Sequence, residues 1–413
     1  MVTRVGAPPE VSLRCSWVPV SSPEEVAVQS RVSAVALDHR QLGAPTPITT
    51  ARYYRLRTVR GGWTSVPSTE LRSDRCSGAI DAFAGSGTAG ATGDGGAAVS
   101  ARLSQPRGIA VAADGAVYVA DTANQRIRRV DAAGVITTVA GGPAASACSY
   151  SGPVAGLGLS SPRDVALDAA GNLYVADTGS QCVRRIDTAG NVTRVAGGGA
   201  TTGCTATGAA TAVSLSSPSG VAVDAAGVVY IADTGRNCIR KVAAGTYSHV
   251  AGGGSTTGCT TTGAATAVSL SGPIDVVVDG AGTVYVADTG RNCVRRVASG
   301  TYAHVAGGGA TTACASTVAS NGVNLSGPEG LALDGFGGIV VVDTGRRCVR
   351  RVADGIVARL ALTGTNSAIG DRGPAQAATA RTPSAAAVMA DGGIVFSDRS
   401  ATSGSNRVRR VWG

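Results

Sequence analysis

The chain has 413 residues, a formal net charge of +9 and only 4% aromatic residues. This length exceeds what one small hydrophobic core usually organises, so we expect two domains. No apolar run is long enough to cross a bilayer, which excludes a transmembrane helix in the sequence.

Residues 7–73 differ in composition from the rest of the chain, because they hold much of the scarce aromatic content, at Trp17, Tyr53, Tyr54 and Trp63. Residues 11–17 and 54–63 alternate between apolar and polar positions, as half-buried strands do. These two segments resemble the early Trp strand and the late Tyr-x-Leu strand of a fibronectin type III domain. We therefore expect a small β-sandwich over residues 1–76, and a disulfide between Cys15 and Cys76, which bracket it.

After residue 76 one segment recurs six times. Its prolines are Pro106, Pro162, Pro218, Pro273, Pro328 and Pro383, and its aspartates are Asp121, Asp177, Asp233, Asp288, Asp343 and Asp398. Both series advance by 56, 56, 55, 55 and 55 residues. Such a constant period indicates one structural unit copied six times, whose copies must stack to bury their apolar faces.

Each unit contains four short strand patterns. In the third copy these are Val221–Val223, Val228–Ala232, Cys238–Val242 and His249–Ala251, separated by Asp-x-x-Gly and Asp-Thr-Gly turn signals. No helical period is evident. Six four-stranded antiparallel meanders arranged radially make an all-β, six-bladed propeller, which we place at residues 77–413.

The repeats resemble the NHL-repeat propellers, whose motif is P-x-G-V-A-V-D-x-x-G-x-V-Y-V-A-D-T-x-N-x-x-I-R-x-V followed by V-A-G. Residues 106–130 and 218–242 match it almost throughout, while the copy at residues 383–411 has diverged. The resemblance implies the fold but not a function, since propellers serve as binding modules and as enzymes.

The ends of the ring predict how it closes. The last copy ends at Gly413, before the fourth strand, whose sequence in other copies ends in Val-Ala-Gly. The segment Ile80–Gly85 has the pattern of this missing strand. We expect this N-terminal strand to complete the sixth blade as a clasp.

Eight cysteines form pairs 34 residues apart: Cys148–Cys182, Cys204–Cys238, Cys259–Cys293 and Cys314–Cys348. The repetition predicts one disulfide in each of blades two to five. Metal binding or free thiols are the alternatives, but the sequence has no Cys-x-x-Cys or Cys/His cluster. Disulfides indicate an oxidising location, so we expect an extracellular or cell-surface protein, although no export signal follows Met1.

Blades one and six carry arginines, Arg126 and Arg407, at the strand position of the second cysteine. Their preceding loops contain Asp94 and Asp371 at a comparable spacing. We expect the ion pairs Asp94–Arg126 and Asp371–Arg407 to anchor the loops in place of the disulfide.

A second set of aspartates follows the first strand of every unit: Asp114, Asp168, Asp224, Asp279, Asp334 and Asp391. Asp before a Gly or Ala step forms turns through its own backbone, and we favour that role. The alternative is a cation site, for which oxygen ligands alone would select Ca²⁺. We expect no other cofactor.

Twelve of the basic residues are six adjacent pairs, among them Arg240-Lys241. Neighbouring strand residues point to opposite faces, so we expect one member of each pair to lie against the neighbouring blade and the other in solvent. The resemblance admits RNA binding on a basic face, but the repeats lack aromatics for base stacking, and nucleic acid is a disfavoured partner.

Catalysis has few candidate residues. Only His39, His249 and His304 are present, and the last two occupy equivalent positions in adjacent blades. No nucleophile elbow is evident, so we nominate no catalytic residue. A lactonase, other hydrolase or lyase of the propeller type remains the alternative.

The sequence therefore favours a non-catalytic extracellular recognition or adhesion scaffold. Its inter-blade loops 200–214 and 255–269 are nearly identical, which suits multivalent binding of a protein or glycan, or self-association. The alternative is that these loops are spacers.

Overall fold

The computed structural model describes residues 78–142, 144–314, 317–366, 371, 373–400 and 404–412. It also describes four two-residue strands before them: β1 (Tyr53–Tyr54) pairs with β4 (Leu71–Arg72), and β2 (Val59–Arg60) pairs with β3 (Trp63–Thr64). The predicted sandwich over residues 1–76 otherwise lies outside the described residues.

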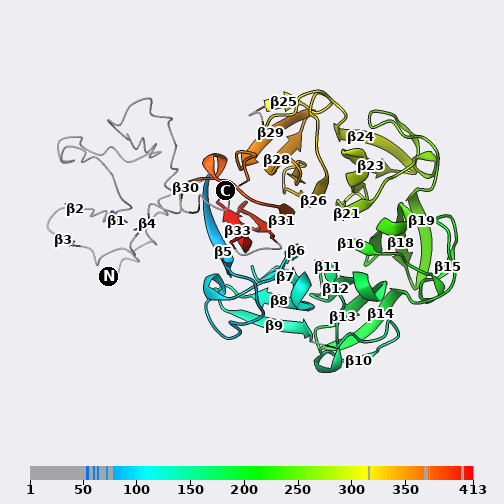
Figure 1. The fold of residues 1–413 in the computed structure, drawn as a ribbon, viewed down its shortest axis with the longest axis horizontal. Coiled ribbons are helices and arrows are strands. Elements are labelled where there is room, and N and C mark those ends of the chain that lie inside the picture. The colour runs from blue at the N-terminus through cyan, green and yellow to red at the C-terminus, as the bar shows by residue number, and fades with distance from the viewer. Residues whose placement is uncertain are drawn as a thin grey trace, which may run out of the picture.

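Six antiparallel sheets are arranged as blades around a central axis, which confirms the six-bladed propeller (Figure 1). The innermost strand of each blade begins at one of the six repeated prolines. These strands are β6 (Pro106–Val111), β11 (Pro162–Leu167), β16 (Pro218–Val223), β21 (Pro273–Val278), β26 (Pro328–Leu333) and β31 (Pro383–Val388). Proline fits this position because it has no backbone N–H and is tolerated at the first residue of a strand.

The second strand of each blade ends at the repeated aspartate. These strands are β7 (Val117–Asp121), β12 (Leu173–Asp177), β17 (Val229–Asp233), β22 (Val284–Asp288), β27 (Ile339–Asp343) and β32 (Ile394–Asp398). A 3₁₀ turn follows in blades one to four, at η3 (Thr122–Asn124), η5 (Thr178–Ser180), η7 (Thr234–Arg236) and η9 (Thr289–Arg291). Each turn ends in a left-handed residue, such as Asn237 at φ 56°, which reverses the chain.

The third and fourth strands complete the meander. The third strands are β8 (Arg126–Val130), β13 (Cys182–Ile186), β18 (Cys238–Ala243), β23 (Cys293–Ala298), β28 (Cys348–Ala353) and β33 (Asn406–Val411). The fourth strands of blades one to five are β9 (Ile136–Gly141), β14 (Asn191–Gly197), β19 (Thr246–Gly252), β24 (Thr301–Gly307) and β29 (Ile356–Ala361).

The sixth blade takes its fourth strand from the N-terminal side of the ring. Strand β5 (Ala79–Gly87) pairs antiparallel with β33, and Ile80 lies opposite Val411. The expected strand Ile80–Gly85 lies within β5. In Figure 1 the early strand β5 and the late strand β33 lie side by side.

Blades two to six each have a fifth strand that the sequence did not predict, so the expectation of four strands per blade holds only for blade one. The additional strands are β10 (Gly152–Pro153), β15 (Gly208–Ala209), β20 (Gly263–Ala264), β25 (Thr317–Ala319) and β30 (Gly373–Pro374). Each belongs to an inter-blade loop and pairs with the fourth strand of the blade that follows. The loops therefore run along the outer edge of the blades and cover it.

Short 3₁₀ turns occur in five of the inter-blade loops, at η2 (Ala98–Ser100), η4 (Val154–Gly156), η6 (Ala210–Ala212), η8 (Ala265–Ala267) and η10 (Ala375–Ala377). They place a small buried residue such as Ala210 or Ala265 against the blade.

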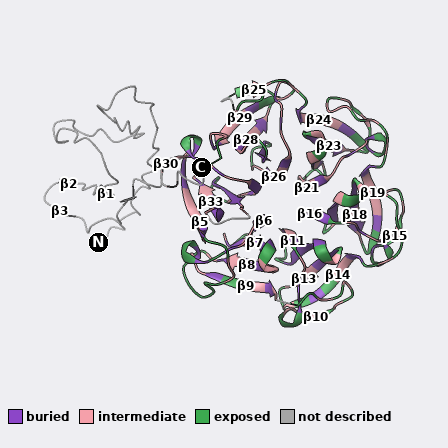
Figure 2. Ribbon diagram, viewed as in Figure 1, coloured by how far each residue is buried: buried purple, intermediate pink, exposed green. Residues whose placement is uncertain are grey.

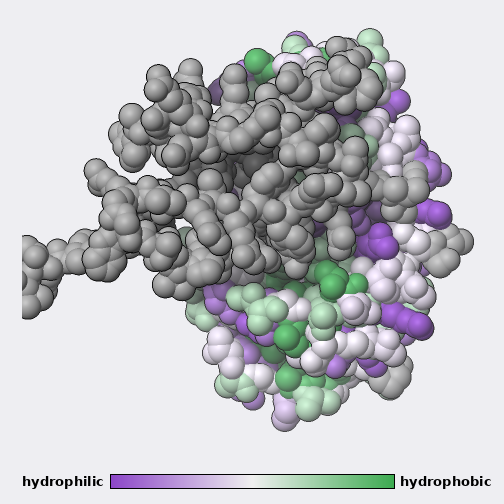
Figure 3. Space-filling model, turned by 90° about the vertical axis from the view of Figure 1, so that its left-hand side faces the viewer, coloured by the Kyte–Doolittle hydropathy of each residue, from purple (hydrophilic) through white to green (hydrophobic). Residues whose placement is uncertain are grey.

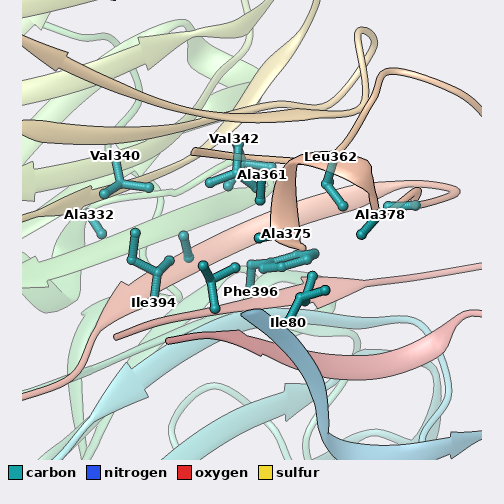
Figure 4. Close-up of a cluster of buried hydrophobic side chains, with 14 residues drawn as sticks. Ile80, Ala332, Val340, Val342, Ala361, Leu362, Ala375, Ala378, Ile394 and Phe396 are labelled. Carbon is teal, nitrogen blue, oxygen red and sulfur yellow. The ribbon is translucent and has the colours of Figure 1, made fainter. Parts of the chain in front are cut away.

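The hydrophobic core is divided among the interfaces between blades. Figure 2 shows buried residues on the strands around the ring and exposed residues on the loops and turns. At the interface of blades five and six, Ile80 from β5 joins Val342 from β27 and Phe396 from β32, all with 0% exposure (Figure 4). Burial of each such side chain contributes about 1.5–3 kcal/mol.

Candidate functional site

The two ends of the ring differ. We call the end at which the six inner strands begin the loop face, and the opposite end, which carries the hairpin turns after the inner strands, the turn face. The second strand returns to the loop face, because Pro218 at the start of β16 lies opposite Asp233 at the end of β17. The repeated aspartates and the cysteines therefore gather towards the loop face. Each inter-blade loop begins and ends there, while its middle part, such as Gly208–Ala209, reaches the start of the fourth strand at the turn face.

A buried Asp–Arg pair lies in every blade below this face. The arginine is the first member of each adjacent basic pair, seven residues after the aspartate in blades one to five. The distances between the arginine nitrogen and the carboxylate oxygen are 3.4 Å for Arg128–Asp121, 2.7 Å for Arg184–Asp177, 2.8 Å for Arg240–Asp233, 2.8 Å for Arg295–Asp288, 3.0 Å for Arg350–Asp343 and 3.9 Å for Arg409–Asp398. One member of each basic pair is thus buried, and it contacts the aspartate of its own blade, a partner that the sequence analysis did not name.

The same carboxylate also fixes the loop that enters the blade. In blade three, Asp233 Oδ1 accepts a hydrogen bond from Ser216 N at 2.7 Å, while Oδ2 faces Arg240. Burial raises the pKa of Asp121 and Asp398 to about 6, and burial also raises the pKa of Asp233, Asp288 and Asp343. Desolvation therefore outweighs the guanidinium at these sites.

The four predicted disulfides of blades two to five are confirmed. Their Cα–Cα distances are 5.8 Å for Cys148–Cys182, 5.9 Å for Cys204–Cys238, 5.9 Å for Cys259–Cys293 and 6.2 Å for Cys314–Cys348. These values lie in the usual range for a bridge. The expected pair Cys15–Cys76 lies outside the described residues.

In addition to the disulfide, the buried arginine of the blade donates hydrogen bonds to backbone carbonyls of the same loop. In blade four, Arg295 Nη1 donates to the carbonyls of Gly258 and Cys259 at 3.1 and 3.3 Å. In blade three, Arg240 donates to the Gly203 carbonyl at 3.0 Å. The disulfide and these hydrogen bonds together attach the first part of the loop to the third strand.

Blade one anchors its loop with a different arginine from the one expected. Asp94 accepts a hydrogen bond from Arg128 Nη2 at 2.6 Å and another from Thr138 Oγ1 at 2.7 Å. Arg126 instead donates to the Ala91 carbonyl at 3.1 Å. The expected Asp94–Arg126 pair is therefore wrong, because Arg126 at the strand start meets loop backbone while Arg128 reaches past it to Asp94.

In blade six the structure brings Asp371 and Arg407 together at 3.4 Å. Asp371 lies closer to the buried Arg409, at 2.8 Å from its Nε. In both blades without a disulfide, the loop carboxylate thus takes the place of the loop carbonyls that the buried arginine binds elsewhere.

The aspartates of the turn face accept hydrogen bonds from their own turns. Asp168 Oδ1 accepts from Asn172 N at 2.9 Å, and Asp224, Asp279 and Asp334 make the equivalent bond to Val228, Thr283 and Gly338. Asp114 and Asp391, two residues later in their turns, accept from Ala116 N and Gly393 N. Within the described residues, no three His, Cys, Asp or Glu side chains lie together as metal ligands would.

A cavity of about 390 Å³ follows the axis of the ring. Its walls are the inner strands, with apolar residues such as Val111, Leu167 and Leu333. Towards the loop face the inner strands crowd together: a Cβ on Gly220 would lie 2.6 Å from the Ile274 carbonyl, and one on Gly330 would lie 2.5 Å from the Ser384 carbonyl. Glycine is required here by the close approach of neighbouring strands.

Two aspartates and five other charged or polar side chains surround the narrow end of this cavity. Asp164 Oδ2 accepts from Val221 N at 2.8 Å, and Asp275 Oδ2 accepts from Leu331 N at 2.7 Å, so each carboxyl joins its blade to the next. Burial raises the pKa of Asp275 to about 7 and raises that of Asp164 well above its usual range, helped by the nearby Asp275. The sequence analysis missed this mouth. The available signal was that the two residues after each repeated proline vary among the blades, as Arg107, Ser219 and Glu329 do.

Two of the three histidines lie in the described part of the chain, at equivalent positions of adjacent blades. His249 and His304 lie on the fourth strands β19 and β24, paired in register with Arg240 and Arg295. His304 Nε2 is 2.9 Å from the Gly307 carbonyl, and burial lowers the pKa of His249. His39 lies outside the described residues.

Comparisons with known proteins agree with this architecture. A family profile described as "NHL repeat" matches residues 159–186, 215–242 and 270–297, and one described as "Teneurin NHL domain" matches residues 86–147. The chain carries NHL repeats. It is 32% identical to Teneurin-3 of Danio rerio over 232 residues, which is 50% of this chain and 8% of that protein.

Solved structures share the fold. A protein of unknown function from Bacteroides thetaiotaomicron has a TM-score of 0.58 at 18% identity, covering 88% of this chain and 83% of its own. An auxiliary nutrient binding protein from Bacteroides ovatus has a TM-score of 0.56 at 14% identity, covering 80% of this chain and 75% of its own. At these identities the likeness extends to the fold alone.

The visible surface is mixed in character. On the side drawn in Figure 3, hydrophilic, intermediate and hydrophobic residues are interspersed over the visible described part of the ring. None of the described helices is long and apolar enough to span a membrane.

Proposed function

We propose that the chain is a non-catalytic recognition and adhesion scaffold that acts outside the cell or at its surface. The observation that carries this proposal is the match of residues 86–147 to a teneurin NHL domain, in a ring whose next four blades each hold a disulfide. Disulfides of this number persist in oxidising compartments.

The loops support a binding role over a catalytic one. Residues 200–214 and 255–269 are rich in small, uncharged side chains, and their disulfides and the underlying arginines hold them in equivalent positions on adjacent blades. Repeated surfaces at fixed angles favour multivalent contact with a protein or glycan, or with a second copy of the chain.

Beads coated with the purified chain test this function. Clustering of the beads with each other would support self-association, and attachment to cells or to glycan-coated beads would support a separate partner. Beads coated after reduction of the disulfides are the control. If coated beads neither cluster nor attach under conditions in which the ring is folded, the adhesion proposal fails.

We also propose that the pairing of β5 with β33 closes the ring. Its support is the register from Ile80–Val411 to Gly87–Asn406, together with the hydrogen bond from Trp412 Nε1 to Asp81 Oδ2 at 2.8 Å. Strand β5, which precedes the first repeat, thereby becomes part of the sixth blade, and the loop that follows it leads into the first blade.

A further inference from the structure

We infer that the narrow, loop-face mouth of the central channel binds a single carboxylate group. This site does not depend on the adhesion function proposed above. It is built from Arg107 on β6, Arg163 on β11, Glu329 on β26 and Arg399 after β32, which converge where the inner strands meet.

The mouth holds more positive charge than its resident carboxylate neutralises. Glu329 accepts hydrogen bonds from Arg399 Nη2 at 2.6 and 2.7 Å, and it lies 3.6 Å from Arg107 Nη1. Arg163 takes no part in this network. Two guanidinium groups therefore share Glu329, and Arg163 is a third cation in the same opening.

The arginines also have unused donors. Within the described residues, Arg163 makes its hydrogen bond to the Ser219 hydroxyl, at 3.3 Å from Nη1, and the buried Nε atoms of Arg107 and Arg399 have no hydrogen-bond partner. Desolvation, followed by repulsion from Arg399 and Arg163, lowers the pKa of Arg107 to about 10. Buried cations that repel one another are stabilised by an incoming anion.

The two aspartates of the mouth do not cancel this charge when they are protonated. Asp164 and Asp275 line the same opening, and their raised pKa values favour the neutral form near pH 7 and below. With both aspartates protonated, the three guanidinium groups and the single carboxylate of Glu329 give the mouth a net charge of +2.

The size of the opening selects the class of anion. Its volume is about 30 Å³, and a buried water needs roughly 10–15 Å³ on the same measure. The opening thus accommodates about two oxygen-sized groups, which matches the two oxygens of a carboxylate better than the four of phosphate or sulfate. Paired Arg nitrogens also match carboxylate geometry.

The test uses the full chain labelled with ¹⁵N-arginine, with sodium acetate replacing sodium chloride at constant ionic strength and pH 6.5. Arg163→Lys and Arg107→Lys assign the Nε–Hε signals. We expect a saturable shift of both signals with a dissociation constant on the order of 1–10 mM. Arg163→Gln should weaken acetate binding about tenfold through loss of a charge-assisted hydrogen bond.

A matched pair of variants separates binding from structure. Glu329→Gln frees two guanidiniums and should tighten acetate binding, whereas the exposed Arg296→Gln should leave it unchanged. A non-saturable shift, an equal response to chloride, or tighter binding of sulfate would overturn the proposal. If Glu329→Gln does not fold, the Arg163→Gln comparison still decides.

A second arm identifies the source of the carboxylate. A capped Gly-Glu-Gly peptide presents a glutamate side chain as a protein partner would. Saturable shifts with the peptide would assign the site to an acidic side chain. Shifts with acetate alone would assign it to small organic acids.

Discussion

The Nε of Arg295 lies 2.8 Å from Asp288 Oδ2, and both side chains are buried beneath the loop face. The next residue, Arg296, is exposed on the opposite side of the same strand. The two adjacent arginines therefore have different roles, and each provides a control for the other.

We expect Arg295→Met to destabilise the ring by about 3–5 kcal/mol, because it leaves a buried carboxylate without its cation. Arg296→Met should change stability by no more than about 0.5 kcal/mol. Chemical unfolding followed by circular dichroism measures both. Equal effects of the two variants would contradict a structural role for the buried pair.

Stability should fall as pH rises from 5 to 8. A carboxyl whose pKa is raised in the folded state, as for Asp121, Asp398 and Asp275, binds its proton more tightly when folded, so its contribution is lost as pH rises through the folded pKa. Aspartates with lowered pKa values, such as Asp168, act in the opposite direction only below this range. His249, whose pKa burial lowers from 6.5, also acts in the opposite direction, but only up to about pH 6.5, and it is one group against the several carboxyls. Melting temperatures across pH 5–8 measure the slope.

The substitution Asp275→Asn measures how much of this pH dependence of stability comes from Asp275. Asparagine resembles the protonated carboxyl, so the variant should be more stable than the original chain at pH 8 and similar to it at pH 5. Asp275 faces Asp164, Arg107, Arg163 and Glu329 around the channel mouth, and these residues are unchanged in the comparison. An Asp275→Asn variant with the original pH slope would contradict the assignment.

Removing the disulfide of blade four should loosen one loop selectively. In the chain-entropy model, each disulfide stabilises the folded ring by about 3–4 kcal/mol, because it restricts the unfolded chain. We expect Cys259→Ala/Cys293→Ala to lower the melting temperature and to accelerate amide exchange in residues 253–269, with residues 199–214 unchanged. A reductant should then have less effect on this variant than on the original chain.

Asp94→Ala should loosen the corresponding loop of blade one, since Arg128 and Thr138 both bind that carboxylate. Faster amide exchange in residues 88–100 is the expected result. Asp114→Ala, on the turn face, is the control and should leave that loop as it is. If neither variant alters the loop, the carboxylate does not anchor it.

A chain that begins at residue 88 should melt at a lower temperature than one that begins at residue 78, because it lacks β5. Ile80, with 0% exposure, contributes to the interface of blades five and six. Scanning calorimetry of the two truncated chains makes the comparison. Identical melting would show that β5 is dispensable for the ring.

The sequence was sufficient to predict the blades and the disulfides because both follow from constant spacing. The prolines that start β6 to β31 and the cysteine pairs 34 residues apart recur without gaps, so errors in one copy are corrected by the others. Short-range turn signals then place the strand ends. The fifth strands were not predicted, because segments such as Gly152–Pro153 and Gly208–Ala209 have low strand propensity. They are strands only through their pairing with the adjacent fourth strand.

The partner of Asp94 was missed for a different reason. Alignment with the cysteines pointed to Arg126, but Arg126 and Arg128 share one strand face, and spacing alone does not distinguish them. The channel mouth escaped because Arg107, Arg163 and Glu329 occupy one repeat position on three blades and become neighbours only when the ring forms. A repeat pattern reveals what the copies share and conceals sites made from their differences.

The pairing of β5 with β33 has a consequence for how the chain is made. Asp81 leaves the ribosome 331 residues before Trp412, its hydrogen-bond partner. At about 5–20 residues per second, β5 waits for tens of seconds while the intervening blades are synthesised. During that interval the backbone edge of β5 is unpaired, and an unpaired strand edge can pair with strands of other nascent chains until β33, the last strand of the ring, has been made.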